Sequence, residues 1–215
     1  IGGAVMHPRV HAFQVTEVAS LNNLVYRTLG APMIIAEKDT VTIELENADD
    51  YLLTVDQLEY FYDQIASVTY SLDGGEISFG DNLDLSIVNT SYANGLRVAG
   101  EDARLVVGDN AKIHINGSDS DGVLVGASGY DGMSAAFGKN AQIIVEGDSS
   151  NAVRAEAWDG KGAKVEFGAD AQIIAKGDAV MGVSAGGENT IIDFTENVNV
   201  TIGTETVPSN NGSWG

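Results

Sequence analysis

Apolar residues alternate with polar residues in five short stretches of this chain, each starting directly after an Asn or an Asp. In one of them Ala111, Ile113 and Ile115 share a face. A period of two is typical of a β-strand with one buried face. The stretches begin at Leu83, Ala111, Ala141, Ala171 and Val198. Gly follows four of them, at positions 117, 147, 177 and 203, and permits the left-handed backbone of a sharp corner.

The sequence around each stretch is a recurring phrase. Its five copies begin at Phe79, Val107, Phe137, Phe167 and Phe194, with offsets of 28, 30, 30 and 27 residues. A fixed period of this size indicates one supersecondary unit stacked on its neighbours. Two further short alternations precede most copies, which gives three strands per unit. The pattern therefore predicts an all-β solenoid, a right-handed parallel β-helix with about five rungs of 27–30 residues.

Stacked rungs place equivalent side chains about 4.8 Å apart along the axis. The sequence predicts an interior aromatic column of Phe79, Phe137, Phe167 and Phe194. It also predicts a corner ladder of Asn82, Asn110, Asn140, Asp170 and Asn197. Asn and Asp tolerate the left-handed region and bond to nearby backbone, so the ladder is interpreted as structural.

The front of the chain, positions 1–66, lacks the repeat. Helical spacing predicts helices over Thr16–Leu29 and Val55–Ala66, with a strand at Val41–Leu45 between them. Positions 1–66 are expected to form a small N-terminal α+β cap or an oligomerising segment. Positions 67–207 would be the parallel β-helix, and 208–215 a polar C-terminal tail.

The amino-acid composition limits the kinds of partner that the chain is expected to bind. The formal net charge is −20, with 31 acidic and 11 basic residues, and this disfavours nucleic acid and anionic lipid. There is no Cys and no run of 18 apolar residues, so we expect no disulfide and no membrane insertion of this segment. No cofactor and no metal site is predicted. Calcium stays open, because Asp119, Asp148 and Asp178 lie near the corner glycines.

No residue is predicted to be catalytic. The Lys and Arg residues are scattered, and the chain shows no Ser/His/Asp arrangement with supporting spacing. The sequence therefore predicts a protein that is not an enzyme. A polysaccharide-active β-helix enzyme is the less favoured alternative.

Two loops carry an aromatic residue before Asp-Gly. Tyr130 and Asp131 precede Gly132, and Trp158 and Asp159 precede Gly160. Asp-Gly favours a tight turn that exposes the preceding ring, so these four residues are the predicted ligand-binding patch. The alternative is that each ring folds back over its own loop.

One outward column contains unusually apolar residues. It includes His114, Ile144 and Ile174, with Ser86 and Thr201 at the equivalent positions. Adjacent outward isoleucines indicate a face that is covered by a loop, another subunit or a partner, and we interpret it as a self-association face.

The phrase Phe-Gly-x-Asn/Asp-Ala-Gln-Ile-x-x-x-Gly, in a Cys-free acidic chain, resembles the passenger regions of bacterial autotransporters and similar β-helical surface adhesins. The resemblance covers about Ser67–Gly203. It implies an extracellular location on the bacterial surface, attached to the outer membrane through a region not present here. It implies a cell-surface adhesin that binds a host cell-surface or matrix protein, a glycan, or other bacteria. The alternative is a stalk segment that self-associates into a homo-oligomer.

Overall fold

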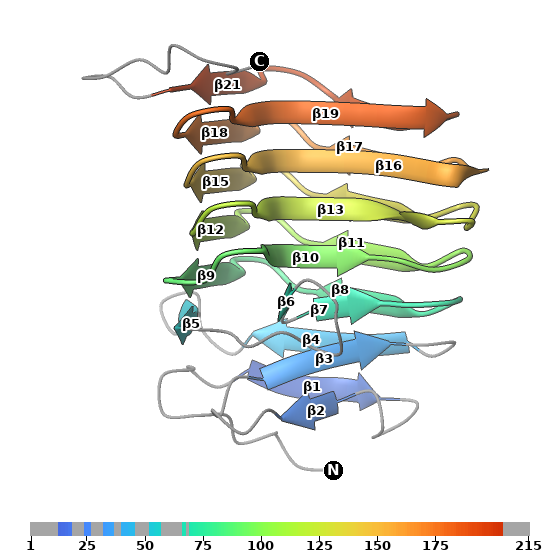
Figure 1. Cartoon of the computed structure of the whole chain (residues 1–215). Coiled ribbons are helices and arrows are strands. Elements are labelled where there is room, and N and C mark those ends of the chain that lie inside the picture. Colours follow the sequence, from blue (N-terminus) through green and yellow to red (C-terminus); the bar gives the residue numbers. More distant parts are fainter. Residues whose placement is uncertain are drawn as a thin grey trace.

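The solenoid predicted from the repeat is the dominant feature of the computed structural model (Figure 1). The structure describes residues 13–18, 24–26, 32–36, 40–45, 52–56, 66–67 and 69–203. From residue 69 onward the chain forms five successive sets of three strands. They are β7 (Thr69–Ser71), β8 (Glu76–Phe79), β9 (Asp84–Val88); β10 (Ala93–Val98), β11 (Arg104–Val107), β12 (Lys112–Asn116); β13 (Asp121–Ser128), β14 (Ser134–Phe137), β15 (Gln142–Glu146); β16 (Asn151–Lys161), β17 (Lys164–Phe167), β18 (Gln172–Lys176); β19 (Met181–Glu188), β20 (Ile191–Phe194), β21 (Asn199–Ile202).

Each strand pairs in parallel with its counterparts in the neighbouring sets, so three sheets run along the molecule. One contains β7, β10, β13, β16 and β19, the second β8, β11, β14, β17 and β20, and the third β9, β12, β15, β18 and β21. The register follows the sequence period, since Lys112 lies opposite Asp84 and Gln142 opposite Lys112. The predicted parallel β-solenoid is confirmed.

The front of the chain continues these sheets. Its strands are β1 (Phe13–Val18), β2 (Leu24–Tyr26), β3 (Pro32–Ala36), β4 (Thr40–Leu45), β5 (Leu52–Asp56) and β6 (Ala66–Ser67). Strands β3, β4 and β5 pair in parallel with β7, β8 and β9. Strands β1 and β2 pair antiparallel with β4 and β3. The strand predicted at Val41–Leu45 is therefore confirmed as β4.

The two predicted helices are wrong where the structure describes the chain. The segment Thr16–Leu29 contains the end of β1 and all of β2, and Val55–Ala66 begins in β5 and ends in β6. The centre of the second segment lies outside the described residues, as does the tail at 208–215. The helices were predicted from the local spacing of apolar residues. Strand pairing with the edge of the solenoid overrides such a local helical preference. The division at residue 66 stays a prediction.

The interior of the solenoid is a set of apolar columns. Leu85, Ile113, Ile143 and Ile173 are successive partners in one sheet and are all buried. The predicted aromatic column is present between the later rungs. The rings of Phe137 and Phe167 stack with centroids 4.9 Å apart, and those of Phe167 and Phe194 with centroids 5.1 Å apart. Buried columns of this kind hold successive rungs together.

The corner before the third sheet has the predicted left-handed backbone. The φ angles are 66° at Asn82, 60° at Asn110, 58° at Asn140, 65° at Asp170 and 53° at Asn197. Because Asn and Asp adopt this conformation more readily than most residues, the corner ladder sets where each strand of the third sheet begins.

Candidate functional site

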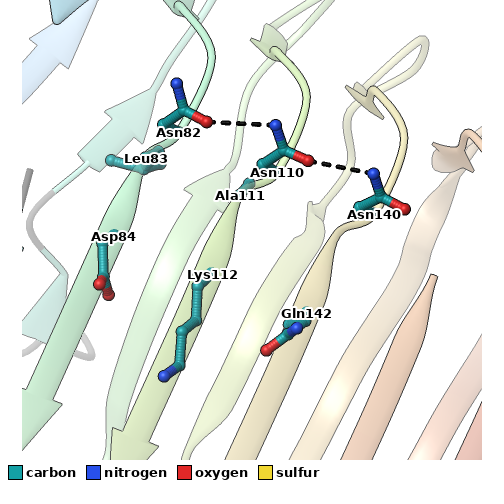
Figure 2. A pocket seen from close by; sticks show the side chains of 8 residues that line it. All are labelled: Asn82, Leu83, Asp84, Asn110, Ala111, Lys112, Asn140 and Gln142. Carbon is teal, nitrogen blue, oxygen red and sulfur yellow. Dashed lines mark hydrogen bonds between the residues drawn. The ribbon is translucent and has the colours of Figure 1, made fainter. Parts of the chain in front are cut away.

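A hollow of about 310 Å³ lies at this corner, where β9, β12 and β15 begin (Figure 2). We call it the corner hollow. Its lining residues come from three rungs: Asn82, Leu83, Asp84, Asn110, Ala111, Lys112, Asn140 and Gln142. Sites for small ligands start at about 300 Å³. The corner hollow is therefore at the small end of that range.

The asparagines form a hydrogen-bonded rim. The Nδ2 of Asn110 donates to Oδ1 of Asn82 at 3.1 Å, and the Nδ2 of Asn140 donates to Oδ1 of Asn110 at 3.1 Å (Figure 2). Their backbone N–H groups donate to the next rung, Asn82 to Asp109 O and Asn110 to Lys139 O, each at 2.8 Å. Both the side chains and the backbone of the rim are therefore hydrogen-bonded to neighbouring rungs.

Beside the rim, three different polar groups lie in a row. Asp84, Lys112 and Gln142 occupy the first position of β9, β12 and β15 and are direct register partners. Figure 2 shows their side chains next to one another on the neighbouring strands. Within the described part of the chain, none of the three side chains makes a hydrogen bond or an ion pair. The row therefore presents a carboxylate, an ammonium and a carboxamide to solvent.

The surroundings of Asp84 shift the pKa of its carboxyl group. Partial burial raises its pKa, and the positive charge of Lys112 and the imidazole of His114 oppose that rise. The carboxylate therefore takes up a proton more readily than an exposed aspartate. Asp84, Lys112 and Gln142 each lie two residues after the corner Asn in successive copies of the repeat phrase, so the sequence period brings them together.

Two of the four predicted ligand-binding residues line a hollow, and the two aromatic residues do not. Asp131 and Asp159 line a second hollow of about 560 Å³, with Gly129, Ala157, Gly160, Lys161, Gly187 and Glu188. The Oδ1 of Asp131 accepts a hydrogen bond from the backbone N–H of Lys161 at 2.7 Å. The Lys161 ammonium lies 3.4 Å from Glu188 Oε1. The charged groups of this hollow are thus partly occupied with one another.

The two predicted rings are not equivalent. Trp158 lies opposite Ser128, while the backbone of Gly160 lies over Tyr130. Trp158 is 36% exposed and the guanidinium of Arg154 lies over its ring at 5.1 Å. Tyr130 packs against the buried core. The assignment of ligand binding to Tyr130, Asp131, Trp158 and Asp159 stays a prediction.

The outward column is assembled as its spacing predicted. Ser86, His114, Ile144, Ile174 and Thr201 are successive partners in the third sheet. Next to it, Glu146 forms a hydrogen bond with His114 at 2.9 Å and lies 3.5 Å from the Lys176 ammonium. The hydrogen bond with His114 lowers the pKa of Glu146, and the charge of Lys176 adds to that effect. Three successive strands are thereby linked on their outer face.

A buried charged cluster has no counterpart among the sequence motifs. Asp121 is only 4% exposed, accepts a hydrogen bond from Asn151 Nδ2 at 2.9 Å, and lies 3.9 Å from the Arg154 guanidinium. Burial raises the pKa of the Asp121 carboxyl. These partners satisfy the carboxylate, so we interpret the cluster as structural.

The described residues contain no group of three or more His, Asp or Glu side chains that could hold a metal ion. Near the corner glycines, Asp148 Oδ1 instead accepts a hydrogen bond from the backbone N–H of Asp178 at 2.9 Å. No helix in the described ranges is long and apolar enough to cross a membrane.

The fold places the described part of the chain in the class of parallel β-solenoids. Comparison with known proteins shows, in addition, that part of the sequence is similar to NAD kinases. The chain is 63% identical over 81 residues to an NAD kinase of Lactococcus lactis subsp. lactis, covering 38% of this chain and 30% of the kinase. It is 53% identical over 79 residues to an NAD kinase of Enterococcus faecalis, covering 37% and 30%. It is 44% identical over 79 residues to an NAD kinase of Streptococcus thermophilus, covering 37% and 28%.

The extent of these matches is limited. The chain spans about 30% of the length of the curated relatives it matches. The 81 matched residues are fewer than those from position 69 to position 203, so part of the solenoid lies outside the match. No family model matches the chain. No solved structure matches it.

These relatives correct the functional interpretation of the repeat. The resemblance to autotransporter passengers and surface adhesins is wrong as an assignment, because the matching proteins are named NAD kinases. The same match overturns the prediction that the protein is not an enzyme. It does not favour the alternative, a self-associating stalk or homo-oligomer.

The predicted partners and location depended on that resemblance and are wrong with it. The partners were host surface or matrix proteins, glycans and other bacteria, and the location was the extracellular surface with outer-membrane attachment. The relatives that overturn them are named NAD kinases. The repeat was informative about architecture, and one architecture serves many functions.

Proposed function

We propose that this chain is part of an NAD-kinase-type phosphotransferase and takes part in transferring a phosphoryl group to NAD. The observation that carries the proposal is the 63% identity over 81 residues to the Lactococcus lactis subsp. lactis NAD kinase. Identity at this level, repeated at 53% and 44% with two other kinases, supports a shared local structure and shared ligand contacts.

Phosphoryl transfer depends mainly on positioning the two substrates and on stabilising charge at the phosphates. Three of the five described lysines, Lys161, Lys164 and Lys176, are each paired with a glutamate, and the net charge of −20 opposes phosphate binding. In the proposal the chain contributes substrate binding, and groups corresponding to the unmatched part of the kinase complete the catalytic site.

A segment exchange tests the proposal. The aligned segment of the Lactococcus lactis subsp. lactis NAD kinase is replaced by that of this chain, and NADP formation from NAD and ATP is measured. We expect a folded chimera with kcat/KM within about tenfold of the parent, a loss of no more than ~1.4 kcal/mol in transition-state stabilisation.

The matched control is a second chimera that carries the corresponding segment of the Enterococcus faecalis kinase, whose identity to this chain is 53%. It shows how much activity is lost when a natural kinase segment is exchanged. A chimera with this chain's segment that keeps the parent's circular dichroism and melting temperature but forms no NADP, beside an active control chimera, would contradict the proposal.

A further inference from the structure

The last described rung, formed by β19, β20 and β21, lies at one end of the solenoid (Figure 1). Its inward side chains continue the buried columns but are themselves exposed. In one column Ile143 and Ile173 are fully buried, whereas the next member, Val200, is 37% exposed. At another position of the repeat Ala171 is 1% exposed and Val198 is 42% exposed. The core of the solenoid therefore ends here in an apolar surface that faces solvent.

The backbone ladder of the second sheet ends at the same rung. In the earlier rungs the carbonyl at the end of each strand accepts a hydrogen bond from the next rung. Phe137 O accepts from Gly168 N–H at 3.0 Å, and Phe167 O accepts from Thr195 N–H at 3.1 Å. Phe194 is the next member of this series, and its strand β20 pairs only with β17 among the described strands. Such an edge strand offers N–H and C=O groups to an added strand.

The opposite end of the second sheet shows how this architecture covers an edge. There β1 pairs antiparallel with β4, with Phe13 opposite Leu45 and Val15 opposite Ile43. An added strand thus continues the ladder at that end. At β20 no such strand is present within the described ranges.

The charges around β20 indicate what kind of strand fits it. Asp193 is exposed and lies opposite Glu166 on β17, so two carboxylates are neighbours on the outer face. The Lys164 ammonium is paired with Glu166. From position 177 to position 215 the sequence contains no Lys, Arg or His, and its acidic residues are Asp178, Glu188, Asp193, Glu196 and Glu205. This end of the solenoid therefore attracts a cationic partner.

From these observations we propose that the edge of β20 binds an extended basic segment of another protein as an added strand. Apolar residues at every second position of that segment cover Ile192 and Phe194, which are the partly buried inward residues of β20. A Lys or Arg between them lies beside Asp193. Main-chain hydrogen bonds and apolar contact supply the affinity, and the alternation and the charge supply the specificity.

The chain's own segments fit this edge less well. Positions 204–215 contain Glu205 and Pro208 and no basic residue, so they lack the complementary charge and one backbone donor. A second copy of the chain offers β1 and β2 as its described edge strands, and neither contains a basic residue. The acidic edge therefore favours a different, basic protein.

Fluorescence anisotropy of the full chain with labelled peptides tests the proposal. Lys-Val-Lys-Val-Lys-Val-Lys is expected to bind with a Kd on the order of 10–300 μM, because one added strand buries far less area than a standard interface. Glu-Val-Glu-Val-Glu-Val-Glu should bind at least tenfold more weakly. So should Lys-Lys-Val-Val-Val-Lys-Lys, which has the same composition without the alternation. Equal binding of the two lysine peptides would show charge attraction alone and overturn the inference, as would no binding of the alternating peptide at about 3 mM.

A pair of N-methylated peptides distinguishes strand addition from other contacts. A strand with one neighbour uses the N–H groups of alternate residues for pairing. One version of the alternating peptide is therefore methylated at the valine nitrogens and the other at the lysine nitrogens. One of them should bind within about threefold of the parent peptide and the other at least tenfold more weakly. Equal loss or equal retention of binding would overturn the inference.

Substitutions in the chain locate the contact. Asp193→Asn should weaken the alternating lysine peptide at least threefold. Asp102→Asn is the matched control, because it makes the same change of charge at an exposed aspartate in the turn between β10 and β11, and it should not alter binding. Equal effects of the two substitutions would overturn the inference.

Amide hydrogen exchange identifies what covers the edge. Adding the alternating lysine peptide should increase protection in β20 and leave β8 unchanged, since β8 already has a strand on each side. Strong protection of β20 before the peptide is added would show that the chain itself, or a second copy detected by sedimentation, covers the edge, and would overturn the inference. These measurements use neither NAD nor ATP, so their outcome is separate from the test of the proposed function.

Discussion

Asn110 donates a hydrogen bond to the side chain of Asn82 on the preceding rung, while its own backbone has a φ of 60°. The same residue accepts a hydrogen bond from Asn140 on the next rung. One side chain therefore joins three rungs and also tolerates the backbone conformation that the corner requires.

Asn110→Ala should lower the free energy of unfolding by about 1–2 kcal/mol. The substitution removes two side-chain hydrogen bonds and places a Cβ without local hydrogen bonding in the left-handed region. Asn110→Gly is the matched control, because it removes the same hydrogen bonds without the conformational strain. Urea denaturation measures both, and a glycine variant less stable than the alanine variant would contradict this account of the corner.

Phe167→Ala should lower the free energy of unfolding by about 3–5 kcal/mol, since it opens a cavity between two stacked rings. Phe194 lies in the last described rung and is only partly buried. Phe194→Ala should therefore cost about half as much or less. Thermal unfolding followed by circular dichroism distinguishes the two, and equal losses would mean that the column does not stabilise the rungs through burial.

Ser71→Ala should raise the free energy of unfolding by about 1 kcal/mol. The Ser71 hydroxyl is buried and has no hydrogen-bond partner among the described residues, so removing it relieves a desolvation cost. Ser150 is a control, because its buried hydroxyl accepts a hydrogen bond from the backbone N–H of Ser120 at 3.2 Å. Ser150→Ala should destabilise by about 1 kcal/mol. A destabilised Ser71→Ala variant would contradict the prediction.

Glu146→Gln should reduce stability at neutral pH and have little effect in acid. The pKa of Glu146 is lowered in the folded chain, so its stabilising contribution is present above the unfolded pKa. It is lost as the pH falls through the folded pKa. Because the side chain is about one-third exposed, the effect at neutral pH should stay below ~1 kcal/mol. Urea denaturation from pH 3 to pH 7 checks this, and a difference that grows in acid would contradict it.

The register of the solenoid could be predicted from the sequence where the repeat phrase is unbroken. The spacing between copies of the phrase identified the column of His114, Ile144 and Ile174 correctly. The same rule holds in the loops, where the offset of 30 residues places Ser128 opposite Trp158. Tyr130 and Trp158 are 28 residues apart, so their similar Asp-Gly motifs do not make them register partners.

The front of the chain was not predictable from local spacing. Apolar spacing around Thr16–Leu29 suits a helix locally, but its described parts are strands that pair with β4 and β3. The row of Asp84, Lys112 and Gln142 was predictable as a set of neighbours, because the three residues occupy the same position in successive copies of the repeat phrase. Its chemistry was not predictable, because the residue type at this position changes from copy to copy.

Because β12 and β15 pair in parallel with Lys112 opposite Gln142, the chain is divided into units that can be removed whole. Deleting positions 112–141 would join Ala111 to Gln142 and bring Gln142 directly beside Asp84. The corner and the aromatic column would close again, but the ammonium would be lost from the row. The architecture tolerates a change in the number of units, whereas the chemistry of the corner hollow depends on which three units are neighbours.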